Sequence, residues 1–323
     1  MDPVYSIVVP LYNEEEVIAE TYKRLTAVMD QADGPYELIF VNDGSRDNTP
    51  ALARALCAKD TRVRLLSFSR NFGHQIAITA GMEHARGQAV VVIDADLQDP
   101  PEVILQMIEK WKEGNGVVYG QRTRREGETA FKKLTASVFY RFLRRMTDVD
   151  IPVDAGDFRL LDRKACNALL SLPESNRYVR GLVSWIGFKQ TGVPYRREER
   201  FAGVTKYPLK KMLTLAGNAI VSFSYKPLKW PTVLGVITAM GGLGYLVALL
   251  IRLLTVGLVQ GEIKWMLGIL LFVLGVAMTS LGIVGAYIGR VYDEAKGRPL
   301  YIIEEDISST HVDSSPHQRT ASK

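Results

Sequence analysis

Cysteine and histidine are scarce in this chain, which contains two cysteines and four histidines among its 323 residues. Cys57 and Cys166 lie far apart, and each falls within a helix-like segment. The sequence therefore predicts two small buried thiols and excludes a disulfide framework or a cysteine-based metal site. The stretch from Met1 to Pro10 also lacks a basic start and runs directly into a predicted strand, so we expect no signal peptide and a cytoplasmic first domain.

The chain also lacks a large excess of basic or acidic residues. The chain carries 40 Lys and Arg residues against 35 Asp and Glu residues, a formal net charge of +5, and we expect no nucleic-acid partner. The hydrophobic residues are unevenly spread. Residues 1–205 have the mixed composition of a globular domain, whereas residues 230–288 are almost purely apolar.

Two long apolar segments follow the globular part. No charged residue occurs from Pro231 to Ile251 or from Trp265 to Ile288. A membrane-spanning helix needs roughly 20 apolar residues. The sequence therefore predicts that residues 230–289 form a hairpin of two transmembrane helices, at about 231–253 and 265–288.

The flanks of these segments predict the orientation of the hairpin. Lysines precede the first segment, and the second is followed by Arg290, Lys296 and Arg298, whereas the connector offers one Lys and one Glu. Because Lys and Arg concentrate on the cytoplasmic side, we expect a multi-pass plasma-membrane protein with its catalytic domain and both termini in the cytoplasm. The tail, residues 290–323, is rich in Ser and Thr toward its end, which predicts disorder from about residue 307.

Strands and helices alternate in the first 205 residues. Runs of apolar and β-branched residues predict buried strands at Tyr5–Pro10, Glu37–Val41, Arg64–Phe68, Ala89–Ile93 and Val117–Gly120. Alternation with helical segments is typical of βαβ units, and so of an α/β fold with a parallel sheet. Polar clusters follow three of the strands, at residues 12–14, 42–44 and 94–98. Right-handed crossovers bring those strand ends to one edge of the sheet, which favours a nucleotide site there.

The third polar cluster contains the residues best suited to a metal ion. Asp94, Asp96 and Gln98 offer carboxylate and amide oxygens, which suit a hard divalent cation that takes substrate phosphates as its other ligands. The alternative is an acidic loop that caps the next helix, with Pro100 or Pro101 in its first turn.

A basic amphipathic segment precedes the hairpin. Residues 129–147 combine an apolar stripe at helical spacing with Lys and Arg residues on the other side. Such a helix is typical of a membrane interface, and a surface helix packed on its own domain is the alternative. Residues 206–229 are expected to form an interfacial helix or linker that leads into the first apolar segment.

The motifs together resemble a known family. Residues 8–15, 41–45 and 94–98 resemble the nucleotide-sugar motifs of family 2 glycosyltransferases with the GT-A fold. Residues 154–161 and 200–209, together with the predicted hairpin, are similar to the bacterial polyprenyl-phosphate (bactoprenol) glycosyltransferases, relatives of dolichyl-phosphate mannose synthase. The resemblance implies a Rossmann-like GT-A domain with a mostly parallel sheet at residues 1–205.

The resemblance also implies an activity. Such an enzyme is an inverting glycosyltransferase that moves one sugar from a nucleotide-sugar to polyprenyl (undecaprenyl) phosphate with the help of Mg²⁺ or Mn²⁺. The donor is expected to be a UDP-sugar such as UDP-glucose or UDP-N-acetylglucosamine, and the product a lipid-linked sugar for the cell envelope. No motif identifies the sugar. A homo-oligomer, dimer or tetramer, is compatible with the glycine-rich stretch at residues 241–244.

Individual roles follow from the matched motifs. Donor binding is implied for Pro10, Tyr12, Glu14, Asp43, Asp94, Asp96 and Arg122. Metal binding is implied for Asp94, Asp96 and Gln98. Asp157 matches the catalytic base of the family, and the acceptor phosphate is expected at Arg200 and Lys206.

Each role has an alternative. Asp43 is also an ordinary turn residue, and Arg122 could be a solvated charge in a basic run. Asp157 could be a buried carboxylate paired with Arg159 or another nearby arginine. It could also orient the acceptor, because a phosphate monoester with a second pKa of about 6 is already anionic near neutral pH. The two basic residues expected at the acceptor phosphate could serve only to attract anionic lipids.

Two other functions share the early motifs. A processive polysaccharide synthase is one, but two spans make a poor polymer channel, and the chain has no Gln-x-x-Arg-Trp segment. A membrane-tethered nucleotide-sugar binding protein without turnover is the other. The presence of Asp94, Asp96 and Asp157 together disfavours it.

Overall fold

The computed structural model describes residues 2–122, 155–198, 262–308 and 311–313, together with scattered positions between 237 and 255. The chain divides into two compact units. The first contains the N-terminal residues and also the C-terminal residues from Arg298 onward, and the second contains a long helix. The first unit therefore extends beyond the boundary predicted at residue 205, because the chain returns to it at its C-terminal end.

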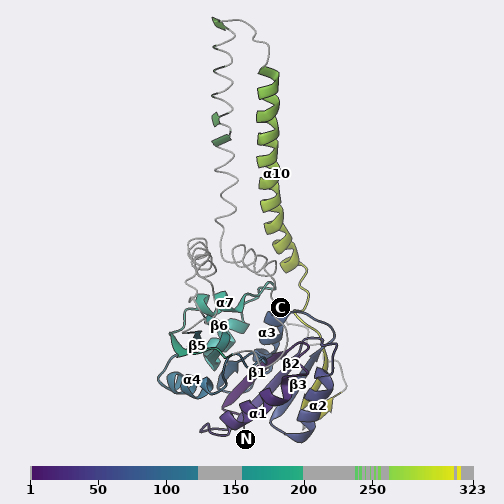
Figure 1. The fold of residues 1–323 in the computed structure, drawn as a ribbon, viewed down its shortest axis with the longest axis vertical. Helices are drawn as coiled ribbons and strands as arrows, with labels where there is room; N and C mark the ends of the chain where they lie inside the picture. The colour runs from purple at the N-terminus through teal and green to yellow at the C-terminus, as the bar shows by residue number, and fades with distance from the viewer. Residues whose placement is uncertain are drawn as a thin grey trace. The chain divides into compact units, whose positions relative to one another are not determined.

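Four parallel strands form the centre of the first unit, and three of them, β1, β2 and β3, are labelled in Figure 1. They are β1 (Tyr5–Leu11), β2 (Tyr36–Asn42), β3 (Val63–Phe68) and β4 (Ala89–Val92). Every residue of β1, β2 and β4 is buried, which explains their continuous apolar runs, since both faces of the sheet are covered. The order β3-β2-β1-β4 confirms the predicted α/β core.

The described residues extend this core to a nine-stranded sheet in the order β7-β5-β6-β4-β1-β2-β3-β8-β9. The added strands are β5 (Val117–Arg122), β6 (Ala155–Asp162), β7 (Gln190–Tyr195), β8 (Ile303–Ser308) and β9 (His311–Asp313). Strand β6 is antiparallel to both β4 and β5, and β8 is antiparallel to both β3 and β9. The sheet is therefore mixed: β5 and β7 at one edge are parallel, as are the four central strands, but the prediction of a mostly parallel sheet does not hold for β6, β8 and β9.

Helices cover both faces of the sheet. They are α1 (Ile18–Met29), α2 (Thr49–Lys59), α3 (His74–His84), α4 (Val103–Lys112), α6 (Arg163–Leu170) and α7 (Val179–Trp185). Residues of α1, α2 and α4 share one core with Tyr5, Ile7 and Val9 of β1. Helix α3 packs on the opposite face, where a Cβ atom on Gly81 would lie 2.1 Å from Val8 Cγ1. Glycine at position 81 thus allows the closest approach of α3 to the sheet.

Strand β8 belongs to the first unit, where it pairs with β3. Ile307 pairs with Leu65 and Ser308 with Arg64, so the strand reaches the position near which disorder is predicted to begin. The Tyr301 ring stacks on Phe68 with centroids 5.1 Å apart. Hydrogen bonds and packing with β3 explain why a Ser-containing segment is ordered here.

The second unit contains α10 (Glu262–Ala295), which includes the second predicted membrane segment. Within the part of the chain that the structure describes, no helix combines the length and apolarity that a membrane crossing requires. Most of the first predicted segment, and all of residues 129–147 and 206–229, lie outside the described residues. The transmembrane hairpin and the interfacial helices stay predictions.

The two cysteines are buried and unpaired, as predicted. Cys57 lies on α2 and Cys166 on α6.

Candidate functional site

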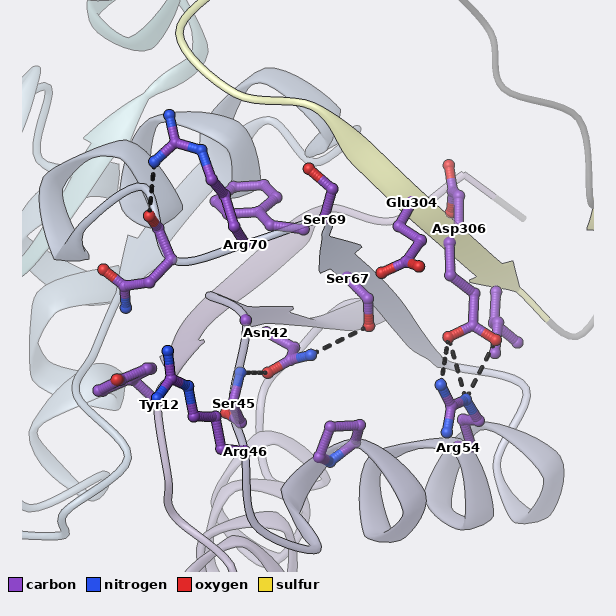
Figure 2. A pocket seen from close by; sticks show the side chains of 16 residues that line it. Tyr12, Asn42, Ser45, Arg46, Arg54, Ser67, Ser69, Arg70, Glu304 and Asp306 are labelled. Carbon is purple, nitrogen blue, oxygen red and sulfur yellow. Dashed lines mark hydrogen bonds and ion pairs between the residues drawn. The ribbon is translucent and has the colours of Figure 1, made fainter.

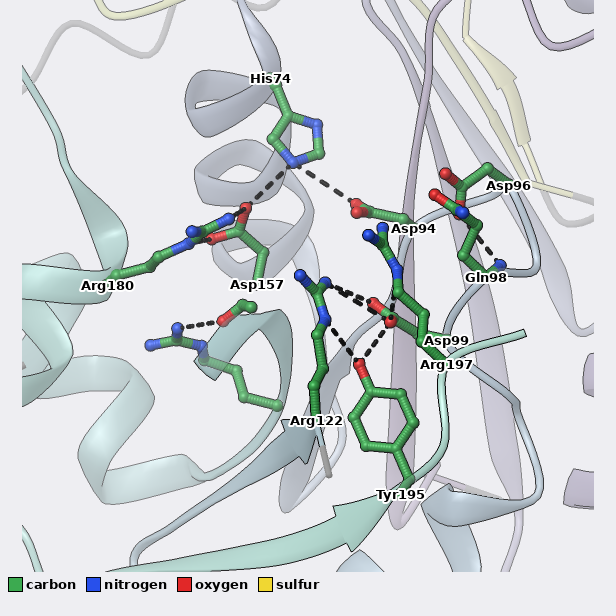
Figure 3. Close-up of polar contacts among 12 residues, drawn as sticks. His74, Asp94, Asp96, Gln98, Asp99, Arg122, Asp157, Arg180, Tyr195 and Arg197 are labelled. Carbon is green, nitrogen blue, oxygen red and sulfur yellow. Dashed lines mark hydrogen bonds and ion pairs between the residues drawn. The ribbon is translucent and has the colours of Figure 1, made fainter. Parts of the chain in front are cut away.

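The strand order reverses between β1 and β4, which makes a crevice at their carboxyl ends the expected ligand site of this sheet. Loops from both sides reach this edge. Asp94 follows β4, and Asp157 lies near the start of the antiparallel strand β6, which begins where β4 ends. His74 comes from the N-terminus of α3 (Figure 3).

The loop after β4 presents its polar side chains in alternation. Asp94, Asp96 and Gln98 are half-buried, whereas Leu97 is 2% exposed. Leu97 has a φ of 58°, a left-handed conformation that is strained for a leucine. Its apolar side chain is held inside by burial, so the backbone turns and Asp96 accepts a hydrogen bond from the Gln98 N–H at 3.2 Å. The three residues predicted as metal ligands therefore alternate with buried residues along the loop.

Asp94 has the properties of a cation ligand. Its Oδ1 atom is buried and accepts no hydrogen bond from the residues that the structure describes, and His74 Nε2 lies 3.4 Å away. Burial raises the pKa of Asp94 to about 6, although His74 opposes the shift. The described residues contain no group of three or more His, Cys, Asp or Glu side chains that could hold a metal ion by themselves. Two carboxylates and an amide fit a cation that keeps phosphate oxygens as ligands, as Mg²⁺ does.

Asp157 is held by a two-pronged ion pair. Arg180 on α7 donates from Nε to Oδ1 and from Nη2 to Oδ2, each at 2.9 Å, and Gln75 Nε2 donates to Oδ2 at 3.4 Å. Burial raises the pKa of Asp157, but Arg180 and His74 outweigh it and hold the pKa well below its usual range. The predicted alternative of a buried carboxylate paired with an arginine describes Asp157, but the partner is Arg180, and Arg159 donates to the Gly156 carbonyl. An ionised carboxylate fixed in this way is suited to orient a ligand and is a weak proton acceptor.

Sequence reasoning missed His74 as a site residue. Its Nε2 atom lies 3.4 Å from Asp94 Oδ1 and 3.4 Å from Asp157 Oδ2, so it bridges the two carboxylates. Burial lowers the pKa of His74, but the carboxylates outweigh it and raise the pKa to about 9. Its position in the sequence could have identified it. Ligands bind at the carboxyl ends of parallel strands, and His74 lies in the loop region after β3, just as the three polar clusters follow β1, β2 and β4.

Asp43 anchors the segment that carries His74. Its Oδ1 atom accepts from the N–H groups of Phe72 and Gly73, and its Oδ2 atom accepts from Gly73 N–H and Asn71 Nδ2. Three donor groups thus bind the carboxylate, with the Gly73 N–H shared between its two oxygens. Asp43 is 2% exposed, and burial raises its pKa while the N–H groups oppose the shift. The structure thus gives Asp43 a positioning role at the N-terminus of α3, where a negative charge is favourable.

Gly44 makes this anchor possible. It has a φ of +64°, and a Cβ atom would lie 2.5 Å from the carbonyl carbon of Arg70. Only glycine permits both the left-handed conformation and the close approach of the two loops.

Arg122 is packed in a polar cluster at the end of β5. It donates from Nε to the Tyr195 hydroxyl at 3.1 Å, and its Nη2 atom lies 3.5 Å from Asp99. Tyr195 in turn donates to Asp99, and burial together with Asp99 raises the Tyr195 pKa. A Cβ atom on Gly156 would lie 2.7 Å from Arg122 Nη2, so the glycine next to Asp157 makes room for the guanidinium. The alternative of a solvated charge does not describe Arg122, which lies within reach of the Asp157 loop.

A pocket of about 650 Å³ adjoins the first two polar loops (Figure 2). Tyr12 is 37% exposed and lines the pocket, whereas Pro10 is buried within β1. Glu14 uses its backbone N–H to bind Thr49 Oγ1 at 2.8 Å. The remaining lining residues include Asn42, Gly44, Ser45, Arg46, Arg54, Ser67, Ser69, Arg70, Asn71, Glu304, Glu305 and Asp306. Arg200 and Lys206 lie outside the described residues.

The chain resembles several known proteins. The family described as "Glycosyl transferase family 2" matches residues 6–170. An uncharacterised glycosyltransferase of Bacillus subtilis (strain 168) is 59% identical over 304 residues, which cover 93% of each chain. The bactoprenol glucosyl transferase of Shigella phage SfV is 40% identical over 301 residues, which cover 93% of this chain and 98% of that one. Among solved structures, glucosyl-3-phosphoglycerate synthase from Mycobacterium tuberculosis has a TM-score of 0.47 at 21% identity, with 68% of this chain and 78% of that chain covered.

Proposed function

Because the chain belongs to glycosyl transferase family 2, and is a glycosyltransferase, we propose that it transfers one sugar from a nucleotide-sugar to polyprenyl phosphate. The observation that carries the proposal is the bridge from Asp94 through His74 to Asp157 at the switch point of the sheet. It joins a loop suited to a donor diphosphate and its cation to a residue suited to an acceptor. The name of the phage relative, bactoprenol glucosyl transferase, supports a lipid-carrier acceptor.

The donor half of the site would bind a nucleoside diphosphate sugar. Asp94, Asp96 and Gln98 would hold Mg²⁺ or Mn²⁺, which as a Lewis acid stabilises the charge on the departing nucleoside diphosphate. Arg122 would add a fixed guanidinium to a donor phosphate, since charge-assisted hydrogen bonds to phosphate are strong. Tyr12 and the adjoining pocket would hold the nucleoside.

The acceptor half would receive a phosphate monoester. Its second pKa is about 6, so its oxygen is already a nucleophile near neutral pH and needs little help from a base. Asp157, fixed by Arg180, would orient the reacting groups, and the cations His74 and Arg180 would offset the negative charge of the acceptor. Attack opposite the leaving group would invert the anomeric carbon and give a β-linked product from an α-linked donor.

The membrane part of the proposal rests on sequence. The uncharged runs at 231–251 and 265–288 favour a two-helix hairpin, and the flanking Lys and Arg residues favour a plasma-membrane protein with a cytoplasmic catalytic domain. Residues 129–147 and 206–229 would lie at the interface, and Arg200 and Lys206 would hold the acceptor phosphate at the lipid surface. A homo-oligomer would form through the membrane helices.

Product analysis tests this function directly. The purified full-length protein in detergent would be given Mn²⁺ or Mg²⁺, undecaprenyl phosphate and a panel of UDP- and GDP-sugars. We expect one donor, UDP-glucose or UDP-N-acetylglucosamine, to yield a lipid that gains one hexose or N-acetylhexosamine by mass spectrometry. The Asp96→Asn variant is the matched negative control. Nucleotide binding without a lipid product from any donor would contradict the acceptor and favour a binding protein without turnover.

A further inference from the structure

Strand β8 forms one wall of the pocket that adjoins the loops after β1 and β2. Strand β8 lies along β3, and its residues 304–307 line the pocket opposite Tyr12 (Figure 2). Ser69 N–H also donates to the Ile302 carbonyl at 3.1 Å. Residues 304–307 therefore line the same cavity as Tyr12 and Asn42, although most of the chain separates them in sequence.

A β-bulge directs one side chain of this wall into the cavity. Ser67 pairs with Glu305, but the next residue, Phe68, pairs with Ile303, so Glu304 is the extra residue in the ladder. Bulges change the direction of a side chain and are common next to active sites. Glu304 is exposed, and its carboxylate points into the pocket above Ser67.

The neighbouring carboxylates have structural partners. Glu305 pairs with Arg54 at 2.8 Å, and Asp306 pairs with Arg64 at 2.6 Å. Asp43 accepts hydrogen bonds at both oxygens, as described above. The Glu304 side chain makes no hydrogen bond or ion pair with any residue that the structure describes, and it has a longer-range electrostatic interaction with Arg54, which already pairs with Glu305. It is therefore the carboxylate that the pocket offers to a ligand.

We propose that Glu304 accepts a hydrogen bond from a ring N–H of the donor's nucleobase and selects the base. The proposal deepens the proposed function and rests on it. A carboxylate repels the diphosphate, so it must face the neutral end of the nucleotide, and a cavity of about 650 Å³ is large enough for a nucleoside. Uracil and guanine carry a ring N–H beside a carbonyl, whereas cytosine and adenine carry a lone pair at that position.

In this role, strand β8 would determine which nucleobase the donor site accepts. The carboxylate would strengthen the binding of uracil or guanine by a charge-assisted hydrogen bond. It would weaken the binding of cytosine or adenine by lone-pair repulsion. The ion pairs of Glu305 and Asp306 would hold β8, and so the bulge, against β3.

Nucleotide binding to the full-length protein in detergent with Mn²⁺ tests the proposal. The ligands are UDP, N3-methyl-UDP, GDP, N1-methyl-GDP, CDP and inorganic pyrophosphate, and affinities are measured by calorimetry. We expect wild type to bind UDP or GDP at least tenfold more tightly than its N-methyl analogue. Glu304→Ala should lose at least tenfold in affinity for that nucleotide and should no longer distinguish it from the analogue, since a hydrogen bond to a charged group is stronger than one between neutral groups. Its affinity for pyrophosphate should stay unchanged.

Matched variants separate base recognition from damage to the fold. Glu304→Gln keeps an acceptor oxygen and should recover part of the discrimination, and Glu109→Gln, an exposed charge on α4, should behave as wild type. If wild type binds a nucleotide and Glu304→Ala keeps its discrimination, or if N-methylation has no effect on wild type, the role of Glu304 is wrong and the proposed function stands. If wild type binds none of the nucleotides, the proposed function fails as well.

Discussion

Arg180 holds Asp157 by two hydrogen bonds of 2.9 Å, one to each carboxylate oxygen. The pair joins α7 to the start of β6 and leaves Asp157 only 5% exposed. It explains why a carboxylate can lie next to the proposed acceptor without repelling it. The positive charge of Arg180 keeps Asp157 ionised, and His74 adds a second cation on its other side.

The two residues should be coupled in stability. Arg180→Gln leaves a buried carboxylate without its main partner, and such a change typically costs about 3–5 kcal/mol. We expect the double variant Arg180→Gln/Asp157→Asn to melt at a higher temperature than Arg180→Gln alone, because the uncompensated charge is removed. Thermal unfolding in detergent measures this. A double variant less stable than both single variants would contradict the coupling.

Asp96 should be required for metal-dependent turnover. Asp96→Asn keeps the shape of the side chain but removes the charge that would bind the cation, and we expect it to abolish sugar transfer at any Mn²⁺ concentration. Mn²⁺ binding in the presence of UDP, measured by electron paramagnetic resonance, should weaken at least tenfold. Glu109→Gln serves as the charge-matched control, and wild-type turnover by Asp96→Asn would refute the metal assignment.

Gly44 should tolerate no side chain. Gly44→Ala combines the left-handed φ of +64° with a methyl group 2.5 Å from the Arg70 backbone, so the loop that carries Asn71 to His74 must move. We expect a lower Tm and a loss of nucleotide affinity of at least tenfold. Gly114→Ala is the control, because Gly114 also has a positive φ, +86°, but has no atom within 4 Å of the added methyl group. It should cost only the conformational strain, about 1 kcal/mol, and leave nucleotide affinity unchanged.

Asp60 should set part of the acid sensitivity of the fold. A hydrogen bond from Arg62 lowers the pKa of Asp60 to about 2, although partial burial opposes the shift. Because the folded-state pKa lies below the ordinary value of 3.8, this stabilisation is present above about pH 4 and is lost as the pH falls toward 2. Asp60→Asn should lower stability by about 1 kcal/mol at neutral pH, since Arg62 is 39% exposed and the pair is screened. The Tm of this variant should fall less steeply between pH 4 and pH 2, and an unchanged slope would contradict the assignment.

The two thiols should be unreactive in the folded protein. Burial raises the pKa of Cys57 to about 12 and that of Cys166 to about 11, so neither forms a thiolate near neutral pH. We expect no reaction with Ellman's reagent at pH 8, and two thiols per chain to react after unfolding in guanidinium chloride. Rapid reaction of either native thiol would show that its helix opens.

The sequence by itself determined the central strands, the burial of both cysteines and the loop that carries Asp94 and Asp96. These features depend on local patterns, since a buried parallel strand is a continuous apolar run, and every parallel strand in a sheet ends at the same edge. Only the tertiary structure decided which partner holds Asp157, that His74 bridges two carboxylates, and that β8 closes the pocket. Arg180 and Glu304 meet the site from distant positions in the chain, and contact between residues so far apart is fixed by packing and strand register, which no local pattern encodes.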